Sequence, residues 1–113
     1  ACGVVQGVGA RALHAWSRLL RRQIRRAGMV ANDHVFGLAW SGAMTEARVL
    51  ALLAHLPAGV SELYFHPAAG RDATLEALMP DYRHQEELAA LLSPRVRLAL
   101  HEAAVPATYG ELG

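Results

Sequence analysis

A histidine near the middle of the chain follows a short apolar run and is itself followed by a proline. The run Leu63-Tyr64-Phe65 predicts a short buried strand. Pro67 lacks an N–H and holds the residue before it extended, so the strand should end at His66. Catalytic groups in α/β enzymes collect where strands end. His66 is therefore the first catalytic candidate, as a general acid or a substrate-binding imidazole.

A structural role explains His66 equally well, since a histidine at a strand end can hydrogen-bond a loop carbonyl and tether the loop. Asp33-His34 is a second polar pair beside an apolar segment. A carboxylate can orient an imidazole. Adjacent residues of an extended segment point to opposite sides, however, which favours a structural role for this pair.

The six histidines do not form a local metal site, because no two of them are separated by two, three or four residues. The sequence has no HExxH, CxxC, GxSxG or phosphate-loop pattern, and its single Cys2 excludes an internal disulfide. We therefore expect no metal ligands within this chain, although His34 or His66 could complete a site formed by a longer one. The other four histidines fall on predicted helices and are expected at the surface or in packing: His14, His55, His84 and His101.

The segment Trp40-Ser41-Gly42 is a candidate substrate-binding loop. Glycine allows the backbone to approach a ligand closely, and tryptophan offers a face on which a sugar can stack. The alternative is a plain connection between two elements with a buried tryptophan. The residues alone leave both interpretations open.

These candidates must be positioned by a helix-rich α/β domain with two or three short strands. Residues 11–27 form an apolar stripe at helical spacing, with Arg18, Arg21, Arg22 and Arg25 largely off it. We interpret this helix as a cover for the sheet with a solvated outer face. The alternative is a surface that contacts anionic lipid or an acidic partner.

A second helix should begin after Thr45, and the strand at 63–65 follows it after a short turn, which is half of an α/β repeat. Asp81 is expected to cap a helix through Leu92, with Arg83 and Glu87 paired on one face. Ser93-Pro94 predicts the start of another helix. Further predictions are a short helix at 73–79, an end of the last helix near 104 and a terminal strand at 107–109.

Composition fits one globular domain of 113 residues, 53% hydrophobic and 19% charged. A net charge of +1 predicts no nucleic-acid partner, and no apolar run is long enough to span a bilayer. The first ten residues carry no signal pattern and are expected to be a disordered or cut edge, so we interpret 1–113 as a partial domain. A cytoplasmic location, with peripheral contact to the inner membrane, fits these features.

Two segments together resemble a known family. Asp33-His34-Val35-Phe36-Gly37-Leu38-Ala39-Trp40-Ser41-Gly42-Ala43-Met44-Thr45 and Glu62-Leu63-Tyr64-Phe65-His66-Pro67 are similar to the C-terminal part of YdjC-like carbohydrate deacetylases, and most similar to the hopanoid-biosynthesis-associated (HpnK-type) branch. The resemblance covers about residues 11–112. One departure is Ala68, where the family more often has glycine.

The resemblance implies a distorted (β/α) barrel and a metal-dependent N-deacetylase that acts on an acetylated amino sugar, in the hopanoid branch an N-acetylglucosaminyl hopanoid lipid. Only His66 matches an active-site position; the family's metal ligands, for Mg or Zn, are expected outside this chain, which alone should be inactive. Rival hypotheses are a non-catalytic module that binds an anionic surface through the arginine-rich helix, and a remnant whose enzyme half is absent.

Overall fold

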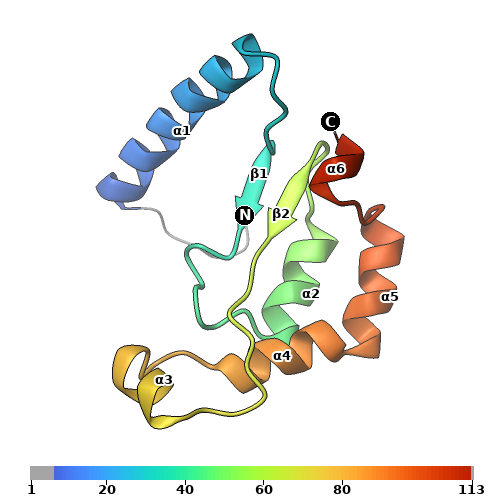
Figure 1. Cartoon of the computed structure of the whole chain (residues 1–113). Coiled ribbons are helices and arrows are strands. Elements are labelled where there is room, and N and C mark those ends of the chain that lie inside the picture. Colours follow the sequence, from blue (N-terminus) through green and yellow to red (C-terminus); the bar gives the residue numbers. More distant parts are fainter. Residues whose placement is uncertain (1–6, 113) are drawn as a thin grey trace.

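The computed structural model describes residues 7–112 as a helix-rich α/β fold (Figure 1). Two short strands and six helices follow one another in the order α1 (Val8–Arg26), β1 (His34–Phe36), α2 (Glu46–Ala54), β2 (Ser61–Leu63), α3 (Ala73–Leu78), α4 (His84–Leu92), α5 (Pro94–Ala103) and α6 (Tyr109–Leu112). The first helix, predicted from residue 11, begins at Val8. Residues 1–6 lie outside the described part of the chain.

The two strands form a parallel pair joined through α2, which confirms the predicted α/β unit. His34 lies opposite Ser61, and Phe36 lies opposite Leu63. The second strand therefore begins and ends two residues earlier than predicted, and it is half-buried. The pairing stops because Gly37 turns the first strand away with φ +117°, leaving Tyr64 N–H to donate the last bond to the Phe36 carbonyl at 3.1 Å.

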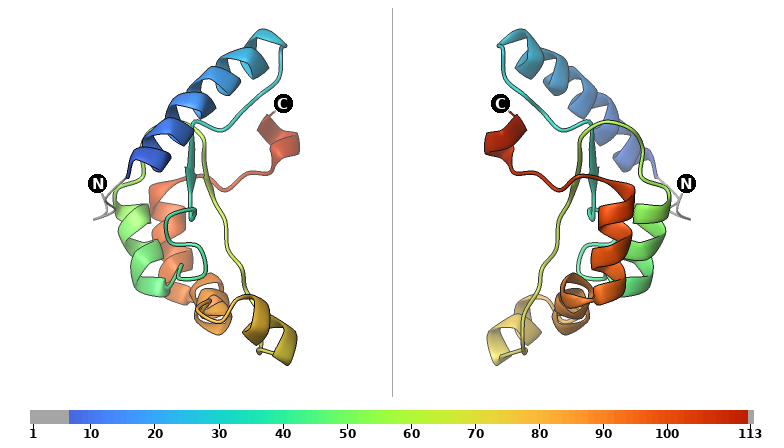
Figure 2. Two further views of the ribbon diagram at one scale, coloured as in Figure 1. Left: turned by 90° about the vertical axis from the view of Figure 1, so that its left-hand side faces the viewer. Right: turned by 90° about the vertical axis from the view of Figure 1, so that its right-hand side faces the viewer.

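The hydrophobic core lies among α2, α4 and α5, which Figure 2 shows gathered beside the strands. Its buried apolar residues are Met44, Val49, Leu52, Leu53, Ala90 and Val96. Phe36 and Leu63 from the strands pack against it. The apolar face predicted for the second helix is thus the one that is buried.

Helix ends agree with the sequence at some positions and differ at others. Ser93 caps α5 as predicted, accepting a hydrogen bond from Val96 N–H. Asp81 does not cap α4, which begins at His84, because Arg83 N–H donates instead to the carbonyl of Gly42 at 2.6 Å. The terminal strand predicted at 107–109 is absent from the described residues. Tyr109 instead begins the helical turn α6, before which Thr108 N–H donates to the Glu111 carboxylate.

Helix α1 stands apart from the other helices in Figure 1, and it makes no set of contacts with any other helix or strand among the described residues. None of its residues is buried, and Trp16 on its apolar stripe is 59% exposed. The interpretation that it covers the sheet is therefore wrong. A helix of 19 residues is about 28 Å long, whereas three-residue strands offer only about 10 Å of sheet face.

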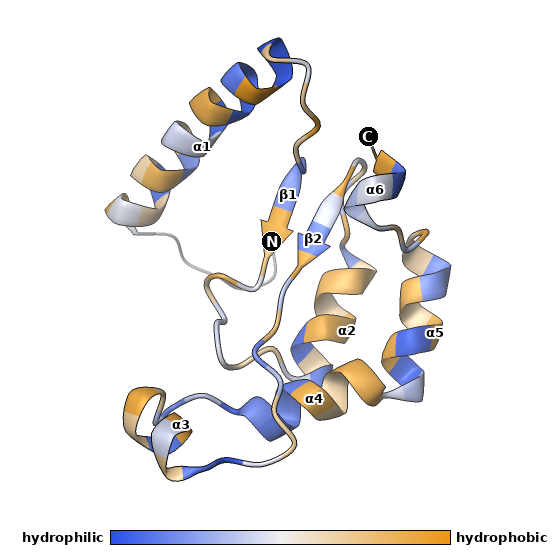
Figure 3. Cartoon of the chain, in the orientation of Figure 1, coloured by the Kyte–Doolittle hydropathy of each residue, from blue (hydrophilic) through white to orange (hydrophobic). Residues whose placement is uncertain are grey.

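Apolar and polar residues alternate along this exposed helix (Figure 3). Its C-terminal end is attached to the rest of the fold by an ion pair between Arg25 and Asp33, 2.7 Å apart. Among residues 7–112, no helix has both the length and the apolar character needed to cross a bilayer.

Candidate functional site

His66 lies three residues beyond the end of β2, and two side chains from α4 hold its backbone. The His84 Nδ1–H donates to the His66 carbonyl at 2.6 Å. The His66 N–H donates to Glu87 Oε1 at 3.3 Å. The candidate catalytic residue is thus fixed from both sides of its α-carbon.

His84 and Glu87 reach the same backbone because residues three apart share one face of a helix. Both are enclosed by the protein, with relative exposures of 3% and 0%. Buried polar side chains are costly unless they make hydrogen bonds, and here those bonds go to His66.

The imidazole of His66 lies between two tyrosine rings. Its centroid is 5.6 Å from that of Tyr64 and 5.2 Å from that of Tyr82, both in edge-on geometry. Tyr82 continues the row to His84 at 5.7 Å. Aromatic pairs at these separations are favourable, so the ring of His66 is packed as well as its backbone.

The loop that contains Ser41 and Gly42 contacts this row through Tyr82. The hydroxyls of Ser41 and Tyr82 are 2.9 Å apart. Gly42 has φ +76°, and a Cβ at that position would lie 2.3 Å from the Tyr82 ring. The structure therefore brings two of the three predicted substrate-binding residues next to the neighbour of His66. We call Ser41, Tyr64, His66, Tyr82, His84 and Glu87 the His66 cluster.

Trp40 is placed differently. It packs, partly buried, against the hydrophobic core, and the guanidinium of Arg48 lies 5.1 Å from the centre of its ring. This arrangement is a cation–π contact within the protein. One face of the predicted sugar-stacking ring is thus already used.

Three buried polar atoms of the cluster have no hydrogen-bond partner within residues 7–112: His66 Nδ1, His84 Nε2 and Glu87 Oε2. The His84 nitrogen bears a lone pair when the ring is neutral, because Nδ1 carries the donated proton. The cluster therefore has unused hydrogen-bonding capacity. The cluster also contains the two hydroxyls of Ser41 and Tyr82.

The described residues do not fit a metal centre. Within residues 7–112, no three side chains of His, Cys, Asp or Glu converge closely enough to hold an ion. His66, His84 and Glu87 lie in one cluster, but two of them are turned toward the backbone of the third. The groups that the described residues offer for catalysis are acids, bases and hydroxyls.

The pair Asp33-His34 acts structurally. The Asp33 carboxylate accepts from Val60 N–H at 2.8 Å and from Arg25 at 2.7 Å. The hydrogen bond from Val60, followed by that from Arg25, lowers the pKa of Asp33 below its usual 3.8. His34 instead stacks near Phe36. The carboxylate links α1 and the 59–60 turn and does not orient His34.

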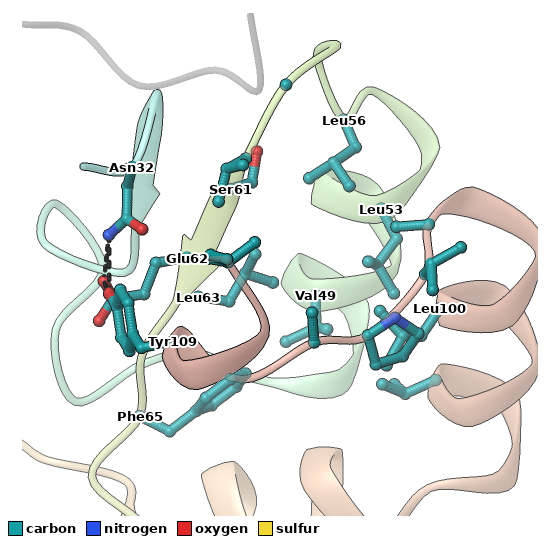
Figure 4. A pocket seen from close by; sticks show the side chains of 18 of the residues that line it. Asn32, Val49, Leu53, Leu56, Ser61, Glu62, Leu63, Phe65, Leu100 and Tyr109 are labelled. Carbon is teal, nitrogen blue, oxygen red and sulfur yellow. Dashed lines mark hydrogen bonds between the residues drawn. The ribbon is translucent and has the colours of Figure 1, made fainter. Parts of the chain in front are cut away.

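A separate cavity of about 430 Å³ lies between β2, α2, α5 and the C-terminal segment (Figure 4). Aliphatic and aromatic side chains form most of its wall, including Leu53, Phe65 and Leu100. Asn32, Glu62 and Tyr109 lie at one side and hydrogen-bond one another. Phe65 faces this cavity and His66 does not line it, so the cavity and the His66 cluster are distinct.

Three residues of the cluster were not predicted as site residues from the sequence: Tyr82, His84 and Glu87. The signal was present in the spacing His84-Gln85-Glu86-Glu87, which places an imidazole and a carboxylate on one helix face. The predicted pair of Arg83 with Glu87 is wrong. Arg83 lies 3.7 Å from Glu86 instead, because Glu87 points inward.

The fold and site define a helix-rich α/β protein with a histidine-centred polar cluster beyond the end of a parallel strand. The family described as YdjC-like protein matches residues 4–102, and the chain belongs to this family, which is related to carbohydrate deacetylases. No curated protein and no solved structure matches the chain significantly. The matched region includes the whole His66 cluster and ends before α6.

Proposed function

We propose that this chain is the His66-bearing part of a metal-dependent N-deacetylase that removes an acyl group from an acetylated amino sugar. The observation that supports it best is His66, held through its backbone and packed through its ring, in a member of a deacetylase-related family. In this proposal the β1–α2–β2 unit belongs to a distorted (β/α) barrel. The divalent ion, Mg or Zn, would be held by residues other than those described here.

Amide hydrolysis requires an activated water, a base and an acid for the departing amine. His66 is assigned the acid role, either protonating the amine or donating a hydrogen bond to the developing oxyanion. The ring of Tyr82 packs against this imidazole, and the hydroxyls of Tyr82 and Ser41 can hydrogen-bond a sugar. Gly42 keeps the loop close to Tyr82, and Trp40 is the third proposed substrate contact.

The test is His66→Ala in the intact enzyme that contains this chain, with acetate release as the readout. Loss of a general acid should lower kcat by about 10²–10⁴-fold. His101→Ala is the matched control, because His101 is exposed on α5. Unchanged turnover in His66→Ala would exclude the catalytic assignment. Residues 1–113 alone should release no acetate.

The proposed substrate is an N-acetylglucosaminyl hopanoid lipid. It can be compared with a free N-acetylated amino sugar at equal concentration. A kcat/KM that is the same for both substrates would argue against the lipid and leave the deacetylase proposal intact.

A second candidate function rests on α1. Its apolar stripe is exposed at Leu13, Trp16 and Leu20, and its other face carries arginines. Such a helix can lie in a bilayer interface, with its cations near anionic headgroups. Of the four arginines assigned to this contact, Arg25 already pairs with Asp33.

Co-sedimentation of residues 1–113 with anionic vesicles tests this function. Binding should weaken with salt, and it should be lost when Arg18, Arg21 and Arg22 are replaced by Gln. Replacement of three exposed arginines outside α1 by Gln, Arg83, Arg95 and Arg97, is the charge-matched control. Equal binding by both variants would rule out the α1 surface.

A further inference from the structure

We infer that His84 and Glu87 are positioning residues that set the direction of the His66 imidazole. The catalytic consequence rests on the proposed function, whereas the geometric one can be measured on the chain alone. Such residues are needed because His66 lies beyond the end of the sheet, where no strand hydrogen bonds hold it. The last strand-type hydrogen bond is made by Tyr64, and His66 lies beyond it.

Both backbone groups of His66 are bound by side chains of one helix. Its carbonyl accepts from His84 Nδ1 at 2.6 Å, and its N–H donates to Glu87 Oε1 at 3.3 Å. A third link joins the same segments, since Ala68 N–H donates to the His84 carbonyl at 3.2 Å. Three bonds around His66 and Pro67 therefore fix the α-carbon from which the imidazole projects.

The helix that supplies these bonds is itself fixed. Ala90, one turn after Glu87, is fully buried, and α4 packs against both α2 and α5. The position of His66 is therefore fixed relative to the hydrophobic core and not relative to the two short strands.

Burial of His84 and Glu87 is energetically unfavourable compared with burial of aliphatic side chains. A buried carboxylate and a buried imidazole are less favourable than aliphatic side chains of similar size unless they are fully hydrogen-bonded. Here Glu87 Oε2 and His84 Nε2 have no partner within residues 7–112. The two side chains orient His66. Orientation matters for catalysis because a displacement of 1 Å at a reacting group can lower a rate about 100-fold.

Two pairs of variants separate positioning from packing. The amide of His84→Asn lies where Nδ1 lies and can donate to the His66 carbonyl, whereas the amide of His84→Gln lies nearer the Nε2 position. At the other site, Glu87→Gln keeps a carbonyl acceptor for the His66 N–H, and Glu87→Leu removes it. Each pair differs mainly in one hydrogen bond to His66.

Amide hydrogen exchange at His66 in residues 1–113 is the first readout. We expect Glu87→Leu to speed this exchange about fivefold or more, and Glu87→Gln to leave it close to the parent value. Exchange that is unchanged in Glu87→Leu would overturn the inference. Should Glu87→Leu not fold, the comparison of His84→Asn with His84→Gln decides.

Turnover of the intact enzyme is the second readout. His84→Gln should lower kcat by up to about 100-fold with little change in KM, and His84→Asn should recover most of it. Asp33→Asn, which weakens the contacts of Asp33 with Val60 and Arg25 outside the cluster, controls for stability and should keep kcat. Equal kcat for His84→Asn and His84→Gln would overturn the inference. If His66 itself takes no part in catalysis, His66→Ala will keep its turnover. A failure of the proposed function can thus be told apart from a failure of this inference.

Discussion

Gly42 and Tyr82 decide whether the loop after β1 can lie beside His66. Gly42 is buried with φ +76°, and its carbonyl accepts from Arg83 N–H. Any side chain there would enter the ring of Tyr82, which stands against His66. A single glycine therefore links the predicted substrate loop to the catalytic candidate.

Gly42→Ala should destabilise the fold by about 2–4 kcal/mol, from left-handed backbone strain together with overpacking against Tyr82. Gly28→Ala is the matched control. Gly28 has nearly the same φ, +77°, but an added Cβ there meets nothing within 4 Å. Urea unfolding of both variants isolates the contact with Tyr82, and equal losses would show that the contact contributes nothing.

Asp33 predicts a pH dependence of stability. Its pKa is lowered by Val60 N–H and then by Arg25, so the folded state binds its proton less readily than the unfolded chain does. The contribution is present above the ordinary pKa of 3.8 and is lost as the pH falls through the lower folded value.

Urea unfolding across this pH range can test the prediction. Asp33→Asn should be less stable than the parent at pH 7, and the difference should shrink below about pH 4. Glu102→Gln, on the exposed side of α5, is the control. A difference that stays constant down to about pH 2 would contradict this account.

At the scale of elements, the sequence was most informative where structure depends on near neighbours. The Ser93-Pro94 start, the apolar face of α2 and the short helix at 73–78 follow from capping and helical spacing. The end of β2 and the start of α4 could not be predicted. They depend on Gly37 and on the bond from Arg83 to Gly42, whose partners lie far apart in the sequence.

In the candidate site, too, local features could be predicted from the sequence and long-range contacts could not. The pattern of a strand followed by His66-Pro67 predicts the catalytic candidate, whose role stays a prediction, and the strand ends earlier than expected. Glu87 was predicted to pair with Arg83, because opposite charges four residues apart on a helix face usually interact. Its burial follows from the approach of the 66–68 segment, which no local pattern encodes. Positioning residues of this kind become visible only when the segments are brought together.

At the scale of the whole molecule, stability should come from α2, α4 and α5, and α1 should contribute little. Leu53 is buried in the core, whereas Trp16 is exposed on a helix without buried residues. Leu53→Ala should therefore cost about 2–5 kcal/mol in urea unfolding, and Trp16→Ala less than about 0.5 kcal/mol. A loss in Trp16→Ala as large as that in Leu53→Ala would mean that α1 packs on the fold in solution. If only Leu53→Ala is destabilising, the apolar stripe of α1 is free to contact a surface without any change in the core that positions His66.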